Sequence, residues 1–175
     1  MELWDLYDEN RRLLPGIMQR GDPQPAGTLH LVVHVCLFDE AGHMLIQHRQ
    51  PFKKGWPGRW DLTAGGSALA GDDSRTAAER ETQEEIGLSL DLQGIHPSLT
   101  IHADDAFDDL YLLQCPVDVR LLTPQPEEVS ELRWCSQQEI QQMLADSRFI
   151  PYPPALIDLL FALKHTPIQP TVGIK

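Results

Sequence analysis

A short acidic segment constrains this chain more than any other part of its sequence. It runs from Ala64 to Leu88, and within it we predict a helix from Ser74 to Ile86. Asp73 is a residue type that favours the N-cap position, and Gly87 is placed where a glycine commonly ends a helix. The sequence therefore predicts one well-bounded helix near the middle of the chain.

Three glutamates lie on one face of this predicted helix. Glu81, Glu84 and Glu85 follow the i, i+3, i+4 spacing. Like charges at this spacing repel, so a sequence that keeps them usually holds a cation there, and carboxylate oxygens suit Mg²⁺ or Mn²⁺. The alternative interpretation is a solvent-exposed acidic face, which is the commoner meaning of a charge run. Two neighbours favour the cation site: Arg80 can orient one carboxylate, and a glycine pair upstream allows close backbone approach.

The same segment resembles the Nudix box. That pattern reads Gly, five residues, Glu, seven residues, Arg-Glu, an aliphatic residue, any residue, Glu-Glu, any residue, Gly and a second aliphatic residue. The matching positions in this chain are Gly66, Arg80, Glu81, Glu84, Glu85, Gly87 and Leu88. Asp72 stands where the box has Glu, and Thr82 stands where it has an aliphatic residue. Asp is one methylene shorter than Glu, and a buried Thr hydroxyl needs a hydrogen-bond partner.

The resemblance implies the Nudix fold, an α/β (α+β) architecture in which a mixed β-sheet is sandwiched between helices (α/β/α). A chain of 175 residues is long enough for one domain with small additions. We divide it into an N-terminal β-hairpin extension and connector (1–27), a Nudix domain (28–168) and a C-terminal tail (169–175).

Residue patterns predict the other elements. The expected hairpin pairs Glu2 to Tyr7 with Arg12 to Met18, and a connector from Arg20 to Gly27 follows. The expected strands are Thr28 to Phe38, His43 to Arg49, Leu88 to Leu92, His96 to His102 and Leu110 to Val117, with an acidic loop from Ala103 to Asp109. Ser136 and Glu139 fit a capping box for a helix ending near Leu144. A last helix is expected from Pro154 to about Lys164, with an apolar face of Leu156, Leu159, Leu160 and Leu163.

The composition of the chain limits the classes of partner that it can bind. The net charge of -12 argues against a nucleic-acid polymer but leaves a single nucleotide open. No apolar run approaches the ~20 residues of a membrane span, and the first residues do not form a signal peptide. Cys36, Cys115 and Cys135 are widely spaced among apolar neighbours, which predicts reduced core residues and a cytoplasmic location. The N-terminal hairpin and the last helix are the surfaces through which a homodimer can form.

An island of positive charge precedes the glycine pair in this acidic chain. It consists of Arg49, Lys53, Lys54 and Arg59. One interpretation is a solubilising surface loop. The functional interpretation, which we prefer, is that these side chains contact phosphate groups whose other side is bridged by metal ions.

The resemblance also implies a reaction. Nudix enzymes hydrolyse a nucleoside diphosphate linked to another group, by attack of water on phosphorus, and use divalent ions for this chemistry. The small-molecule diphosphate is then the expected partner and Mg²⁺ or Mn²⁺ the expected cofactor. The resemblance assigns the metal to Glu81, Glu84, Glu85 and the backbone carbonyl of Gly65.

The resemblance leaves the general base open. Arg80 is expected to orient Glu81, and either Glu81 or Glu128 is expected to act as the base. Glu128 lies in the loop six residues before Trp134. Asp104, Asp105, Asp108 and Asp109 compete for its role, although a solvated acidic loop is the simpler interpretation of these four residues.

Two other functions remain as alternatives. The run from His30 to Trp60 resembles the isopentenyl-diphosphate isomerase branch of the superfamily, but Gly65 and Ser67 stand where that branch has its cysteine and histidine. No glutamate occurs from Leu110 to Cys115, so we expect no double-bond isomerisation, which needs such acid groups. The departures from the Nudix box also permit a noncatalytic nucleotide-binding module.

Overall fold

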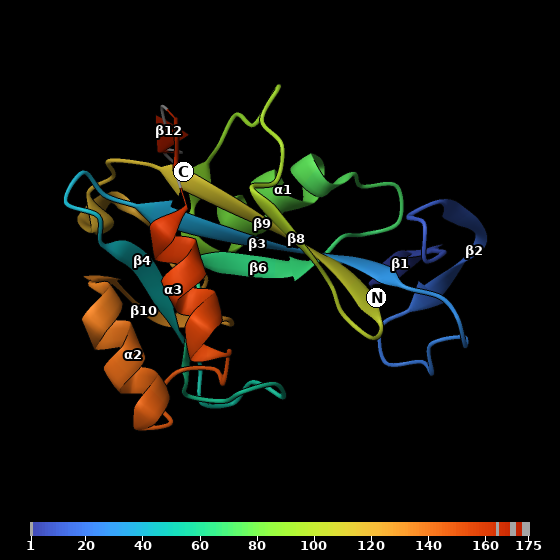
Figure 1. Ribbon diagram of the computed structural model, residues 1–175, viewed down its shortest axis with the longest axis horizontal. Helices are drawn as coiled ribbons and strands as arrows, with labels where there is room; N and C mark the ends of the chain where they lie inside the picture. The colour runs from blue at the N-terminus through green and yellow to red at the C-terminus, as the bar shows by residue number, and fades with distance from the viewer. Residues whose placement is uncertain (1, 164, 169–170, 173–175) are drawn as a thin grey trace.

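A mixed β-sheet forms the centre of the molecule (Figure 1). The computed structural model describes residues 2–163, 165–168 and 171–172. Their strands are β1 (Leu3–Tyr7), β2 (Leu13–Gln19), β3 (His30–Phe38), β4 (Met44–Arg49), β5 (Trp60–Asp61), β6 (Ala64–Ser67), β7 (Leu88–Ser89), β8 (Leu99–His102), β9 (Ala106–Gln114), β10 (Val129–Cys135), β11 (Thr166–Pro167) and β12 (Thr171–Val172). The helices are α1 (Ser74–Ile86), α2 (Gln137–Ala145) and α3 (Pro154–Ala162), with a 3-10 turn at Val119–Leu121.

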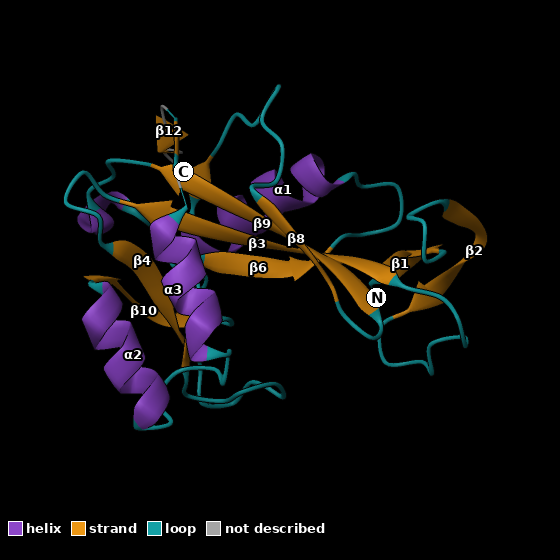
Figure 2. Cartoon of the chain, in the orientation of Figure 1, coloured by secondary structure: helices purple, strands orange, loops and turns teal. Residues whose placement is uncertain are grey.

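The sheet has helices on both faces, which confirms the expected α/β/α sandwich (Figure 2). Its strand order is β10-β4-β3-β9-β11, with β5 paired to β4, β6 to β3 and β8 to β9. β3 runs antiparallel to β6 and parallel to β9, which makes the sheet mixed. Because side chains alternate along a strand, Val33 and Val35 face the core that contains α1, while Cys36 and Phe38 face the core under α2 and α3.

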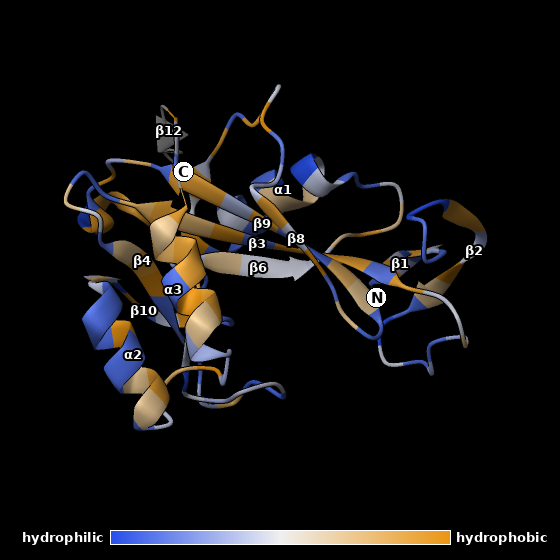
Figure 3. Ribbon diagram, viewed as in Figure 1, coloured by the Kyte–Doolittle hydropathy of each residue, from blue (hydrophilic) through white to orange (hydrophobic). Residues whose placement is uncertain are grey.

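Hydropathy follows this layering (Figure 3). The central strands β3 and β9 are mostly apolar because both of their faces are covered, whereas α2 is polar along much of its length. In α2 only Ile140 and Met143 are buried, and the capping box of Ser136 and Glu139 is present. That cap confirms the predicted start of the helix.

The N-terminal hairpin is also confirmed, and it is fastened to the domain. Tyr7 exchanges backbone hydrogen bonds with Leu29, and the backbone N–H of Ala70 donates to the carbonyl of Leu3 at 2.7 Å. The Trp4 ring stacks on His30, with centroids 4.6 Å apart. The hairpin therefore has a fixed place beside the loop that leads from β6 to α1.

Several element boundaries differ from the expectation. β9 begins at Ala106, so the predicted acidic loop is shorter, and Asp108 and Asp109 lie on a central strand. Asp109 is fully buried, which corrects its interpretation as a solvated loop residue. A carboxylate is tolerated there because the Arg11 guanidinium and the Thr100 hydroxyl donate to it. The sequence pattern could not show these partners, because Arg11 is distant in the chain.

Other differences are smaller. β7 and β8 are shorter than predicted, β10 was not predicted, and the glycine pair lies on strand β6. α3 ends at Ala162, and the predicted endpoint Lys164 lies outside the described residues. Leu159 is 41% exposed, so it does not belong to the packed face of α3, where Ile157 and Leu160 are buried.

Two observations bear on membrane and redox expectations. Within the described residues, none of the helices has the length and apolar character needed to cross a bilayer. The three cysteines are buried and free, as the sequence predicted.

Candidate functional site

Helix α1 has the predicted bounds and both predicted caps. The Asp73 carboxylate accepts the Thr76 backbone N–H at 2.7 Å, and Gly87 adopts the left-handed conformation with φ of 72°. The helix end is then fixed by a second segment, because the backbone N–H of Gln125 donates to the carbonyl of Glu85 at 2.8 Å. This bond brings the loop that carries Glu128 to the acidic face of α1.

Glu85 is held between two strands. The amide of Gln47 on β4 and the backbone N–H of Gly65 on β6 both donate to its Oε2, at 2.9 and 3.0 Å. Burial raises the pKa of Glu85 to about 8, the negative charge of Glu81 adds to this rise, and the two hydrogen bonds oppose it. The raised pKa means that, among the residues that the structure describes, no positive charge close to Glu85 compensates the cost of burying its carboxylate.

Glu81 lies directly against Gly66. A Cβ atom at Gly66 would come within 2.5 Å of Glu81 Oε1, so this glycine makes room for the carboxylate. Burial raises the pKa of Glu81, while the neighbouring Arg80 guanidinium opposes that rise. The structure thus explains physically why a residue without a side chain stands at the start of the box.

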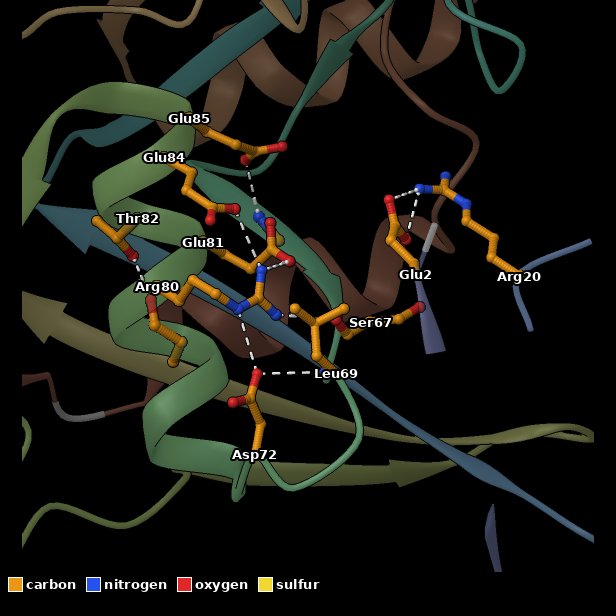
Figure 4. Close-up of polar contacts among 12 residues, drawn as sticks. Glu2, Arg20, Ser67, Leu69, Asp72, Arg80, Glu81, Thr82, Glu84 and Glu85 are labelled. Carbon is orange, nitrogen blue, oxygen red and sulfur yellow. Dashed lines mark hydrogen bonds and ion pairs between the residues drawn. The ribbon is translucent and has the colours of Figure 1, made fainter. Parts of the chain in front are cut away.

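Arg80 connects the carboxylates of the site (Figure 4). Its guanidinium donates to Glu81 at 2.8 Å, to Glu84 at 3.2 Å and to Asp72 at 3.1 Å. It also donates to the carbonyl of Ser67 on β6 at 3.1 Å. Arg80 therefore joins the helix to strand β6 and bonds the carboxylate of Glu81.

Both departures from the Nudix box have partners in the structure. The shorter Asp72 side chain still accepts from Arg80, and it also accepts the backbone N–H of Leu69 at 3.2 Å. Thr82 is fully buried, and its hydroxyl donates to the carbonyl of Ala78 at 2.8 Å. Neither substitution leaves a buried polar group unpaired.

The three glutamates of α1, Arg80 and the glycine pair line one cleft of about 450 Å³. Its walls come from the N-terminal hairpin, strand β6, helix α1, the end of β4 with the loop that follows it, and the loop before β10. The lining residues are Glu2, Arg20, Val32, Arg49, Lys53, Gly65, Gly66, Ser67, Leu69, Arg80, Glu81, Glu84, Glu85, Gln125 and Glu128.

Of the four predicted phosphate-binding residues, the structure brings two to the cleft. Arg49 and Lys53 line it, whereas Lys54 and Arg59 do not. The Arg59 guanidinium donates to the carbonyls of Ser147 and Phe149 and lies over the Trp56 ring, so its role is structural. Lys54 is exposed away from the cleft lining. The four cations are close together in the sequence, but the fold directs only two of them into the cleft.

Arg49 is held by a buried polar chain. Its Nε donates to the carbonyl of Gly55 at 3.1 Å, and its guanidinium pairs with buried Asp61 at 3.4 Å. Tyr152, from the segment before α3, donates its hydroxyl to Asp61 at 2.9 Å. The guanidinium therefore has a fixed direction at the cleft wall.

Glu128 lies at the cleft and forms an ion pair with Lys53. None of its four aspartate competitors lines the cleft: Asp104 and Asp105 are exposed, Asp108 pairs with His34 at 2.7 Å and Asp109 with Arg11. The choice between Glu81 and Glu128 as the base stays a prediction.

The donor set suits a divalent cation after a small rearrangement. In the part of the chain that the structure describes, no three acidic, histidine or cysteine side chains are arranged to hold a metal ion as they stand. Arg80 now bonds both Glu81 and Glu84, so Glu84 must turn from Arg80 before it can share a cation with Glu85. Glu84 is half exposed and free to do so. The oxygen donors and the raised pKa of Glu85 both fit a hard cation.

Sequence reasoning missed Gln47, Glu2 and Arg20. Gln47 is not part of the cleft lining but holds Glu85, and it was hidden in an apolar strand. Glu2 and Arg20 line the cleft and belong to an extension that carried no recognisable motif. Only an even spacing along the strand, which places Gln47 and Arg49 on one face, could have suggested the first of them.

Comparison with known proteins places these features in a family. A NUDIX domain model matches residues 28–154. An uncharacterized Nudix hydrolase of Listeria monocytogenes is 45% identical over 165 residues, which cover 94% of this chain and 96% of the relative. An isopentenyl-diphosphate Delta-isomerase of Streptomyces coelicolor is 31% identical over 164 residues, which cover 89% of this chain and 82% of that enzyme.

A solved structure shares the fold. The crystal structure of a Deinococcus radiodurans protein aligns with a TM-score of 0.69 at 21% identity, and the alignment covers 91% of this chain and 97% of that one. A MutT protein from Methanosarcina mazei aligns with a TM-score of 0.52 at 20% identity over 74% of this chain and 91% of that one. At these identities the likeness shows the fold alone.

Proposed function

This chain belongs to the NUDIX family, and from that membership we propose that it is a divalent-metal-dependent hydrolase of a diphosphate linkage. The substrate is a nucleoside diphosphate derivative or a related organic pyrophosphate. One observation carries the proposal: the carboxylates of α1 and the cations Arg49 and Lys53 line the same cleft. A metal-bound diphosphate needs both kinds of group at once.

Each side chain has a role in this proposal. Glu81, Glu84, Glu85 and the carbonyl of Gly65 would hold Mg²⁺ or Mn²⁺, which when bound would neutralise phosphate oxygens and activate water. Arg80 keeps Glu81 in place through its hydrogen bond of 2.8 Å.

The reaction itself is a hydrolysis. Arg49 and Lys53 bind and orient the phosphates. Glu81 or Glu128 takes a proton from the attacking water while the water oxygen bonds to one phosphorus. The bond between that phosphorus and the bridging oxygen breaks, and the other phosphate group leaves with the bridging oxygen.

The test is cleavage of a panel of nucleoside diphosphate derivatives and organic pyrophosphates, with Mg²⁺, with Mn²⁺ or with a chelator. The two phosphate monoesters are separated by chromatography, or a phosphatase is added so that they release phosphate. Glu85→Gln is compared with Glu127→Gln, which makes the same substitution at an exposed residue outside the cleft. We expect the first variant to lose activity by a factor of at least about 100, in keeping with the loss of one charge-stabilising group in an active site. Equal activity of the two variants would contradict the proposed site.

The rival isomerase function meets a steric obstacle at Gly65. A Cβ atom there would lie 2.5 Å from the His34 ring and 2.8 Å from the carbonyl oxygen of Val33. Since the second contact is with backbone, the strand leaves no space for a cysteine at this position. We therefore propose that isopentenyl diphosphate is not isomerised, and migration of its double bond by the purified protein would show otherwise.

A noncatalytic module remains the alternative of a different class. It predicts that a calorimetric titration detects metal or nucleotide binding while no compound of the panel is cleaved. The family membership and the paired Asp72 and Thr82 side chains favour the hydrolase. The buried free cysteines support our further proposal that the protein acts in the reducing cytoplasm.

A further inference from the structure

The N-terminal hairpin contributes one wall of the candidate active site. Glu2 and Arg20 line the same cleft as Glu81 and Glu85. The Arg20 guanidinium donates to both carboxylate oxygens of Glu2, at 2.8 and 2.9 Å, and its backbone N–H donates to the Glu2 carbonyl at 3.0 Å. Figure 4 shows this pair beside Glu81, on the side of the site away from helix α1.

The hairpin holds its pair in this position. The backbone N–H groups of Ala70 and Gly71, in the loop between β6 and α1, donate to the Leu3 carbonyl and to the Asp5 carboxylate at 2.7 and 2.8 Å. The same loop also supplies Asp72 to Arg80. The hairpin that positions Arg20 is thus bonded to the loop that leads into helix α1.

Arg20 differs from the other cations of the cleft. Its side chain is 60% exposed, whereas those of Arg49, Lys53 and Arg80 are 16%, 18% and 21% exposed. Its partner Glu2 is also exposed, at 44%. An exposed ion pair contributes little to stability, so a ligand anion can replace Glu2 on Arg20 without loss to the fold.

We propose that Arg20 is a specificity-determining residue that binds a third anionic group of the substrate, beyond the diphosphate held by Arg49 and Lys53. The inference rests on the proposed function and narrows its substrate class to diphosphates that carry a further negative group, of which a third phosphate is the simplest. Glu2 occupies Arg20 in the free protein and is displaced when that group binds.

The first test compares two inorganic probes that differ by one phosphate group. Binding of pyrophosphate and tripolyphosphate is measured by calorimetry at constant free Mg²⁺. Arg20→Gln is expected to weaken tripolyphosphate binding about tenfold, the effect of losing one charged hydrogen-bond donor. Pyrophosphate binding is expected to change less than about twofold, within the usual range for a rim charge that does not touch the ligand.

Arg12→Gln is the matched control. Arg12 belongs to the same hairpin, is exposed and lies outside the cleft lining, so its replacement changes the net charge equally without removing the proposed contact. It is expected to bind both probes as the unaltered protein does. Thermal unfolding of both variants checks that the hairpin stays folded.

Glu2→Gln tests whether Glu2 competes with the ligand for Arg20 or only repels the ligand through its nearby negative charge. If Glu2 competes for Arg20, its replacement strengthens tripolyphosphate binding, and this gain disappears when Arg20 is also Gln. A gain of the same size in both backgrounds would mean that Glu2 acts only through its charge, and it would overturn the displacement.

The outcomes distinguish this inference from the proposed function. If the unaltered protein binds pyrophosphate and tripolyphosphate equally, or if Arg20→Gln weakens both equally, Arg20 does not read a third group, while the hydrolase proposal stands. If neither probe binds, the cleft is not a phosphate site and both proposals are wrong.

Discussion

Gly66 leaves no space between its own Cα and the carboxylate of Glu81, since a Cβ atom there would meet Oε1 at 2.5 Å and Cδ at 2.6 Å. Gly66→Ala should therefore displace the Glu81 carboxylate. The displaced group is the end of a flexible side chain, so we expect a loss of unfolding free energy below about 1 kcal/mol. Because the carboxylate loses its position, hydrolysis should fall at least about 100-fold.

Gly55→Ala is the control for this substitution, since an added methyl group there meets nothing within 4 Å. Turnover and urea unfolding of both variants provide the measurement. Full activity of Gly66→Ala would show that Glu81 does not need its observed position.

Arg49 and Arg59 form a matched pair of arginines with different surroundings. Arg49→Gln removes a cation from the cleft and should weaken Mg²⁺-pyrophosphate binding about tenfold or more. Arg59→Gln removes hydrogen bonds to the carbonyls of Ser147 and Phe149, so it should lower the unfolding free energy by about 1–2 kcal/mol and leave binding unchanged. Calorimetry and urea unfolding separate the two effects, and a reversed pattern would contradict the assignment.

Thr82 occupies a core position where the family pattern has an aliphatic residue. Thr82→Val removes its hydroxyl, but the Ala78 carbonyl that accepts from this hydroxyl belongs to helix α1 and keeps its place in the helical hydrogen bonding. The change in unfolding free energy should therefore stay within about 1 kcal/mol, since the lost bond is offset by burial of a methyl group. Destabilisation above about 2 kcal/mol in urea would mean that the hydroxyl has a further partner.

Asp109 makes stability depend on acid pH. Burial alone would raise its pKa, but the hydrogen bonds from Arg11, Ser74 and Thr100 outweigh burial and lower it. The folded-state pKa then lies below the unfolded value of about 3.9, so the stabilisation is complete above that value and disappears as pH falls through the folded-state pKa.

Asp109→Asn tests this linkage. At pH 7 the variant should lose about 2–3 kcal/mol, less than the roughly 3–5 kcal/mol of a fully buried pair, because the Arg11 side chain is 38% exposed and can reach water. The difference from the unaltered protein should shrink as the pH falls below about 4. Urea unfolding at pH 7, 5 and 3.5 measures it, and a difference that does not vary with pH would show that Asp109 has an ordinary pKa.

Local sequence patterns predicted helix α1 with both of its caps, the capping box of α2 and the N-terminal hairpin. These features depend on residues a few positions apart, so the sequence holds all the information that they need. Strand ends were less accurate. The residue pattern predicts a strand that starts at Leu110, whereas β9 starts at Ala106, since two consecutive aspartates indicate a loop unless a distant arginine pairs with one of them.

The candidate site divides in the same way. Sequence spacing alone placed the three glutamates and Arg80 on one helix, because helix geometry brings residues three and four positions apart to one face. Tertiary structure decided which cations face them: Arg49 and Lys53 reach the cleft, Arg59 is turned toward the segment before α3, and Arg20 comes from the hairpin. Contacts between residues so far apart in the sequence depend on strand register and on the topology of the chain. No local sequence pattern encodes them.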